Sequence, residues 1–178
     1  MDNIAIDLSQ TFDSRDRFPV IDLFHASDKP APHLVLSALR TAWLLDQVVA
    51  RSLTPFKLHY AQYNAMLLLE RNAPEGVRPS TIGEFLCVSR PNVTKLLARL
   101  HARALIEERP DPDDGRAIRA FITPAGSNVL AEASVALDHE LRRVVSLLPM
   151  QDARALQALL DRFRHSVSTA LADRSDKS

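Results

Sequence analysis

The stretch of sequence that decides the fold spans residues 81–123 and reads TIGEFLCVSRPNVTKLLARLHARALIEERPDPDDGRAIRAFIT. Its first part predicts a short helix over about 82–86, because Thr81 and Glu84 stand three residues apart before an apolar run, as in a capping box. Ser89 is placed to cap a second helix, whose first turn tolerates a proline because its amide hydrogens have no helical partner. The sequence therefore predicts two short helices joined by a tight turn.

The second helix separates its side chains into an apolar face and a basic face. Apolar residues that recur at helical spacing are expected to be buried: Val93, Leu96, Leu97 and Leu100. The opposite surface carries cationic and hydrogen-bonding side chains: Arg90, Asn92, Thr94, Lys95 and Arg99, with Arg103 at the end. No acidic residue occurs between Ser89 and Arg103, so the outward face is uniformly basic.

A two-stranded ribbon is expected directly after the second helix. Ile106–Arg109 and Ala117–Ile122 read as strands, and the loop Pro110–Arg116 between them is rich in Pro, Asp and Gly. A lone basic helix is usually only a solvated surface. A basic second helix behind a short turn and followed by such a ribbon instead predicts a winged helix–turn–helix, whose second helix fits the DNA major groove.

Four motifs in and just after this stretch carry a family resemblance. They are IGEFLCVSR at 82–90, LIEER at 105–109, DPDDGR at 111–116 and TPAG at 123–126. Together they resemble the winged helix–turn–helix of the MarR family of bacterial transcription regulators, sharply over 80–126 and by helix pattern alone over about 33–172. The chain departs from the family pattern where glycine is usual, at Cys87 in the turn and Ala104 before the ribbon, and Gly115 replaces a common basic residue at the wing tip. Cys87 is expected to adopt a positive φ at some cost.

The second helix and the wing supply the expected DNA contacts. Side chains near the start of the helix are expected to reach base edges: Ser89, Arg90, Asn92 and Thr94. Lys95 and Arg99 are expected to contact phosphates. These contacts predict double-stranded DNA as the partner, in the form of a pseudo-palindromic operator.

The wing needs a basic side chain, because its loop carries three Asp residues that phosphates would repel. Arg116 is expected to reach the minor groove, where negative potential is concentrated. Asp114 is expected to bond Arg116 or the loop amides and to hold the wing in shape, as the matching residues do in the family. Asp111 and Asp113 are expected to cap the turn or to face solvent.

Composition and charge fit one intracellular domain. With 178 residues and 46% hydrophobic content, the chain is long enough to bury a core. Its 22 basic and 22 acidic residues balance, but residues 1–30 hold six Asp against three bases, so a basic patch can exist elsewhere. The single cysteine excludes an intrachain disulfide and a Cys-based zinc cluster. No apolar run is long enough to span a bilayer, and we expect a cytoplasmic protein that does not insert into membranes.

The rest of the chain predicts an arm and four further helices. Residues 1–32 are expected to form a partly flexible N-terminal arm, and the polar tail from Asp173 is expected to fray. Helices are expected at about 33–53, at about 55–70 starting from Pro55, at about 124–148 capped by Thr123, and at about 151–171. The predicted fold is mainly α with a small β-wing, in which a MarR-type domain over 33–172 contains a DNA-binding lobe at about 55–123.

The flanking helices at about 33–53 and 124–172 are expected to form a dimerisation region. A near-heptad stripe runs along the helix after the wing: Leu130, Leu137, Leu141, Val144 and Leu148. These helices carry more apolar surface than one small lobe can cover, which favours a homodimer over packing on their own lobe. The resemblance implies the same dimer.

A ligand site is expected where the first two long helices meet in family members. Five residues would line an aromatic, partly cationic pocket suited to a small aromatic acid or phenol: Arg40, Trp43, His59, Tyr60 and Tyr63. The alternative is that these aromatic residues are ordinary core.

Enzymatic motifs are missing from the sequence, which contains no Gly-rich phosphate loop, no His-Glu-x-x-His and no nucleophile elbow. We therefore expect no catalysis, no cofactor and no metal site. Cys87 is expected to be a small, partly buried turn residue rather than a redox sensor. The expected function is that of a homodimeric repressor released by a small molecule, and repression is implied by the resemblance alone. The alternative is a helical interaction or architectural DNA-binding protein without a ligand response.

Overall fold

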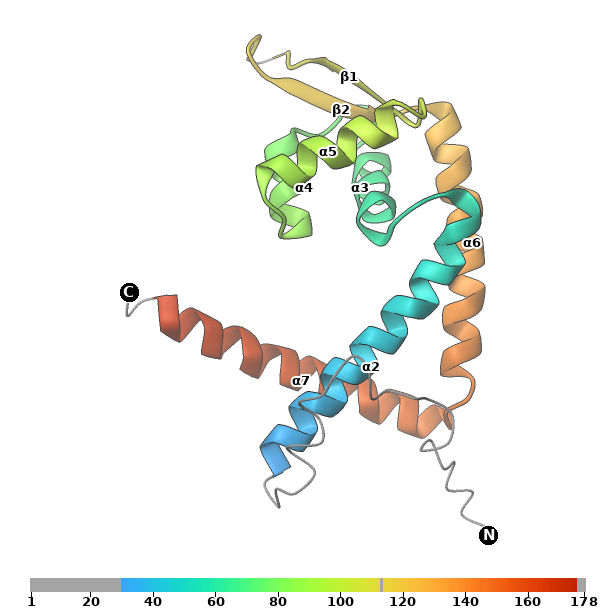
Figure 1. Cartoon of the computed structure of the whole chain (residues 1–178), viewed down its shortest axis with the longest axis vertical. Helices are drawn as coiled ribbons and strands as arrows, with labels where there is room; N and C mark the ends of the chain where they lie inside the picture. The colour runs from blue at the N-terminus through green and yellow to red at the C-terminus, as the bar shows by residue number, and fades with distance from the viewer. Residues whose placement is uncertain (1–29, 113, 176–178) are drawn as a thin grey trace. The chain divides into compact units, whose positions relative to one another are not determined.

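The computed structural model describes residues 30–112 and 114–175, so the predicted arm lies outside the described residues except at its end. Helices and strands follow one another as a mainly α chain with one β-ribbon (Figure 1). The elements are α2 (Pro30–Leu53), the 3-10 helix η2 (Thr54–Phe56), α3 (Tyr60–Arg71), α4 (Pro79–Leu86), α5 (Arg90–His101), β1 (Ile106–Pro110), β2 (Ile118–Ile122), α6 (Pro124–Val145) and α7 (Met150–Ser175). This is the predicted fold class.

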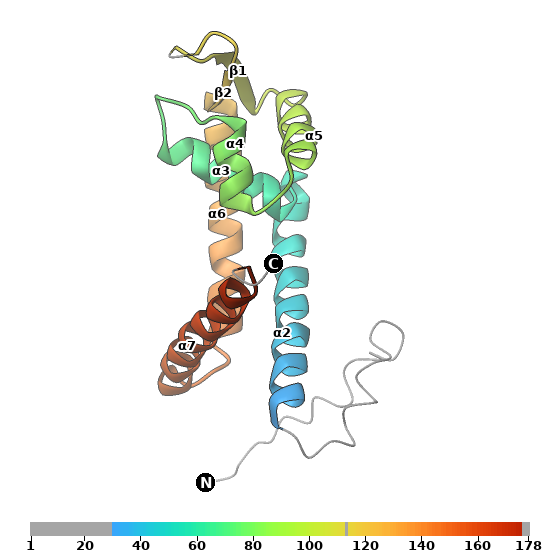
Figure 2. The same cartoon turned by 90° about the vertical axis from the view of Figure 1, so that its left-hand side faces the viewer.

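The chain divides into two compact units, Met1–Gln47 and Val48–Ser178, with the boundary inside α2. The described part of the first unit is the helical stretch from Pro30 to Gln47. The second unit holds α3, α4, α5 and the ribbon as one group, which both views show (Figures 1 and 2). No helix of the described residues is long and apolar enough to cross a membrane.

The core of the second unit lies between α3, α4, α5 and the ribbon. Its largest fully buried side chains come from these elements and from the end of α2: Leu53, Met66, Leu69, Ile82, Val93, Leu97, Leu100 and Ile106. The predicted apolar face of α5 is buried as expected, because Leu96 joins Val93, Leu97 and Leu100 in the core. Burial of this face fixes which side of α5 points outward.

The ribbon pairs β1 with β2 in antiparallel register, with Ile106 opposite Ile122 and Glu108 opposite Ala120. Val77, just before α4, adds a bridge to the outer edge of β2 through two backbone hydrogen bonds of 2.9 Å with Ala120. The wing is therefore attached to the segment that leads into α4.

The start of α6 is fixed by a hydrogen-bonded N-cap residue and by a glycine that packs against the backbone before β1. The hydroxyl of Thr123 accepts a hydrogen bond from the Gly126 amide at 3.0 Å and donates one to the Ala104 carbonyl at 2.8 Å, which confirms the predicted cap. A Cβ on Gly126 would lie 2.0 Å from the Leu105 carbonyl oxygen, so only glycine fits there.

Two predicted helix starts are wrong. The first short helix begins at Pro79 rather than near Ile82, so Thr81 lies within its first turn and the predicted capping box does not form. Proline is favoured at this first position because its φ is preset and it needs no amide partner. Pro55 belongs to the 3-10 helix, and α3 begins only at Tyr60, because Lys57 adopts a left-handed conformation that interrupts the helix.

Two predicted helix ends also differ. The helix after the wing ends at Val145, three residues before the predicted end. The last helix continues to Ser175, past the position where the sequence predicts fraying.

Candidate nucleic-acid interface

The start of α5 is positioned by a left-handed turn residue. Cys87 has φ 53° and ψ 41°, and its amide donates back to α4, so the chain reverses without a glycine. The positive φ predicted for Cys87 is therefore confirmed. Ser89 then takes the N-cap position of α5, and its carbonyl accepts from the amides of Asn92 at 2.9 Å and Val93 at 3.1 Å. The Ser89 hydroxyl makes no capping bond, which leaves it at the exposed end of the helix.

The outward face of α5 carries the side chains that the sequence predicted to contact DNA. All of them are exposed on the side opposite the core: Ser89, Arg90, Asn92, Thr94, Lys95 and Arg99. The Thr94 hydroxyl donates to the Arg90 carbonyl at 3.1 Å, so toward a ligand it is oriented as an acceptor.

Arg103 does not belong to this basic face, contrary to the prediction. Its guanidinium donates to the carbonyls of Lys57 at 2.7 Å and Phe56 at 2.8 Å. These two carbonyls lie at the left-handed break before α3, so Arg103 ties the end of α5 to that break. The basic face therefore consists of Arg90, Lys95 and Arg99.

The tip of the wing is organised by Asp114. One carboxylate oxygen of Asp114 accepts a hydrogen bond from the backbone amide of Arg116 at 3.0 Å. The Asp114 carbonyl accepts from the Ala117 amide at 2.8 Å, which closes the turn. Of the two partners predicted for Asp114, the structure shows the loop amide, and Arg116 itself is exposed.

The prediction that Asp111 caps the turn or faces solvent is wrong, because its side chain does neither. The carboxylate is 0% exposed and accepts from Arg78 Nε at 2.6 Å and from Arg119 Nε at 2.8 Å. Arg78 precedes α4 and Arg119 lies on β2, so one buried carboxylate joins the segment before α4 to the base of the wing. The signal available in the sequence was Arg119, which lies on a predicted strand close to three acidic residues.

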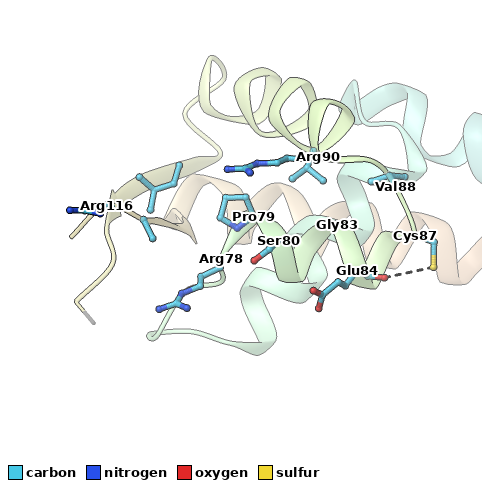
Figure 3. Close-up of a pocket in the computed structure, with 12 residues that line it drawn as sticks. Arg78, Pro79, Ser80, Gly83, Glu84, Cys87, Val88, Arg90 and Arg116 are labelled. Atoms are coloured by element: carbon cyan, nitrogen blue, oxygen red, sulfur yellow. Dashed lines mark hydrogen bonds between the residues drawn. The ribbon is translucent and has the colours of Figure 1, made fainter. Parts of the chain in front are cut away.

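A groove of about 650 Å³ opens between α4, the start of α5 and the wing (Figure 3). Three arginines from three different elements line it: Arg78 before α4, Arg90 at the start of α5, and Arg116 on the wing. Among the lining residues that the structure describes, Glu84 is the one carboxylate. In Figure 3 the three arginines lie toward one end of the groove, and Glu84 and Cys87 lie away from that end.

Cys87 is exposed, so the prediction of a partly buried thiol is wrong. The left-handed conformation turns its side chain outward, where Sγ lies 3.7 Å from the Glu84 carbonyl.

The residues predicted for a ligand site are divided between the two units. Arg40 and Trp43 belong to the first unit, on α2, whereas His59, Tyr60 and Tyr63 belong to the second. Tyr63 is buried in the core, with its hydroxyl 3.1 Å from Ser134 Oγ on α6, as the core alternative expects. Tyr60 is half exposed.

His59 caps α3 through its backbone, whose amide donates to the side chain of Gln62 at 3.0 Å. Among residues 30–112 and 114–175, no group of three or more His, Cys, Asp or Glu side chains is arranged to hold a metal ion.

Comparison with known proteins finds similarity to transcription regulators, two of which were solved with DNA. A model described as "MarR family" matches residues 56–117. The transcriptional repressor CouR, solved on a 23-mer DNA duplex, is 26% identical with a TM-score of 0.67, over 78% of this chain and 97% of that one. The Staphylococcus aureus MepR–DNA complex is 19% identical with a TM-score of 0.64, over 79% of this chain and 99% of that one.

A ligand-bound structure is also similar. CouR from Rhodococcus jostii RHA1 bound to p-coumaroyl-CoA is 20% identical with a TM-score of 0.65, over 77% of this chain and 95% of that one. No curated protein sequence matches the chain.

Proposed function

We propose that the chain is a winged helix–turn–helix transcription regulator of the MarR family, whose model matches residues 56–117, and that it acts as a homodimeric, sequence-specific repressor of transcription. The observation that carries the proposal is the outward face of α5, which is basic and contains no carboxylate from Ser89 to Arg103. The adjacent wing presents Arg116 beside this face. A helix of this kind fits the major groove, and a guanidinium on the wing suits the minor groove next to it.

The exposed side chains divide into two proposed roles. Those at the start of α5 contact base edges: Ser89, Arg90, Asn92 and Thr94. Lys95 and Arg99, one and two turns further along, contact phosphates. Arg116 enters the minor groove, and Asp114 holds the loop through the Arg116 amide.

The proposal of a homodimer is supported by exposed apolar side chains on three helices. They are Leu34, Val35, Leu39 and Leu45 on α2, Val135, Leu141 and Val145 on α6, and Leu156, Leu159, Leu160, Val167 and Leu171 on α7. Exposure of so many large apolar groups favours a further partner surface, because a monomer would leave them in water. Pairing through a twofold axis also places two recognition helices on two half-sites.

We further propose that a small aromatic or phenolic compound releases the repressor from DNA. The support is that CouR was solved with p-coumaroyl-CoA, which carries a phenolic acyl group. Within the second unit, the proposed contacts are His59 and the half-exposed Tyr60. Isothermal titration with aromatic carboxylates and their thioesters should give heat that is lost in a His59→Ala, Tyr60→Ala double variant. Absence of heat from all such compounds would remove this part of the proposal.

Selection of DNA by the protein tests the main proposal. Duplexes of about 30 base pairs, long enough for two half-sites, are selected from a random library and then titrated by fluorescence anisotropy. We expect the selected duplex to show twofold symmetry and binding that weakens steeply with salt. Arg90→Ala should lose preference for that duplex over random DNA, whereas the matched control Arg71→Ala, on the last turn of α3, should keep it. No enrichment of any duplex would refute the proposed function.

A further inference from the structure

The groove between α4, α5 and the wing lies where a DNA strand has to pass. When α5 occupies the major groove and Arg116 the neighbouring minor groove, the sugar–phosphate strand that separates the two grooves crosses the space between these elements. That space is the groove of about 650 Å³, and the described residues of its lining include three arginines and one glutamate. The net positive lining matches the charge of a phosphate diester.

We propose that a backbone phosphate of each half-site binds in this groove and that Arg78 is one of the residues that bind it. This inference rests on the proposed function. Arg78 lies outside both the recognition helix and the wing, as the N-cap residue of α4, and was not among the predicted DNA contacts. Its side chain lines the groove and is 43% exposed, so a phosphate can reach it. A guanidinium is a planar fork of five donors, which can engage a carboxylate and a phosphate together.

Asp111 is the positioning residue for this phosphate site. Its buried carboxylate accepts from Arg78 Nε at 2.6 Å and from Arg119 Nε on β2 at 2.8 Å. Charge-assisted bonds of this length fix the direction of a guanidinium. Asp111 therefore holds Arg78 at a fixed position relative to the wing. Arg78 can then bind the phosphate at the same time as Arg116 occupies the minor groove.

Arg78→Gln is the main test, because Asp111 still has Arg119 as a guanidinium partner in this variant, and a melting curve checks that the variant folds. Log affinity for the selected duplex is measured between about 50 and 200 mM salt. We expect the slope against log salt to become shallower by about 0.9 for each phosphate that the variant no longer neutralises, hence by about 1.8 for a dimer on two half-sites. Affinity for random and selected duplex should fall by the same factor, since binding to a phosphate reads no sequence.

Neutral phosphates then locate the site on the DNA. Single methylphosphonate linkages are placed one by one along the selected duplex, and the loss of affinity is recorded for wild type and variants. Wild type should lose affinity at a phosphate between the major-groove and minor-groove sites, and Arg78→Gln should be insensitive at that same phosphate alone. The charge-matched control Arg71→Gln, outside the groove, should follow wild type at every position.

Asp111→Asn tests the positioning role, since it keeps the side-chain shape and removes the charge. A carboxylate that only repelled DNA would give tighter binding when neutralised. We expect instead weaker binding, and no additional loss in the Arg78→Gln, Asp111→Asn double variant. If Asp111→Asn melts at low temperature, Arg78→Lys replaces it: the retained charge should preserve the salt slope, and the absence of the planar fork should still reduce affinity.

Different results refute the proposed function and the phosphate site at Arg78. A protein that selects no duplex refutes the proposed function, and with it the phosphate site at Arg78. A protein that selects a duplex, and whose Arg78→Gln variant matches wild type in salt slope and in the phosphate scan, overturns the role of Arg78 alone.

Discussion

Replacing Asp114 with alanine sets two effects of one carboxylate against each other. The carboxylate accepts the Arg116 amide at 3.0 Å, and an exposed hydrogen bond of this kind contributes about 0.5–1.5 kcal/mol to the order of the loop. Its repulsion of a phosphate at about 10 Å in water is about 0.4 kcal/mol before salt screening, and a fraction of that at physiological salt. The ordering effect is larger, so Asp114→Ala should bind DNA more weakly, by about 0.5–1 kcal/mol for each wing and about 5- to 30-fold for a dimer.

Fluorescence anisotropy on the selected duplex measures this change, and Asp114→Asn serves as the matched control. Asparagine keeps an oxygen that accepts the Arg116 amide but carries no charge, so it should bind at least as tightly as wild type. Circular dichroism melting checks that both variants fold, since the ribbon is the affected element. Tighter binding by Asp114→Ala, equal to that of Asp114→Asn, would refute the ordering role and leave repulsion as the only effect of the carboxylate.

Four further substitutions have expected outcomes. Arg116→Ala should weaken binding by about 1–3 kcal/mol, the range of one good groove contact, and unchanged affinity in the same titration would exclude it from the interface. Gly126→Ala should lower the free energy of unfolding by about 3 kcal/mol in urea melts, because its Cβ would meet the Leu105 carbonyl oxygen at 2.0 Å; an unchanged midpoint would show that α6 can shift. Ala104→Gly should raise the stability by about 0.5–1 kcal/mol, since φ is 53° and the methyl group is exposed, and a lower melting temperature would contradict this. Cys87→Ser should bind the selected duplex as wild type does, whereas release of wild type alone by peroxide would make the exposed thiol a sensor.

The recognition helix and the wing are predictable from sequence because their signals are local. Ser89 precedes a proline and an apolar repeat, so the start and buried face of α5 follow from a few adjacent residues. The strand boundaries of the ribbon agree with the prediction to within one residue, since apolar positions and turn residues delimit them. Thr123 and Pro124 fix the start of α6 in the same way.

The roles of Asp111 and Arg103 could not be predicted from the sequence, because each side chain binds a partner far away in the chain. In the sequence alone, the Asp residues of the wing loop look alike, and nothing shows that Arg78, 33 residues earlier, points at Asp111. Arg103 looks like a continuation of the basic face, yet its partners are carbonyl groups 46 and 47 residues before it. Local patterns predict which elements form, whereas these pairings depend on how the elements pack.

The contacts of Asp111 separate the tip of the wing from the rest of the fold, so the tip can change in sequence independently of the core. The ribbon is fastened at its base, because the Asp111 amide donates to the Ala117 carbonyl at 2.9 Å while the carboxylate is tied to two segments outside the loop. Substitutions or insertions beyond this closure should therefore leave the melting temperature almost unchanged. We therefore expect the wing tip to accept changes in sequence and length that alter its contact with DNA without loss of the fold.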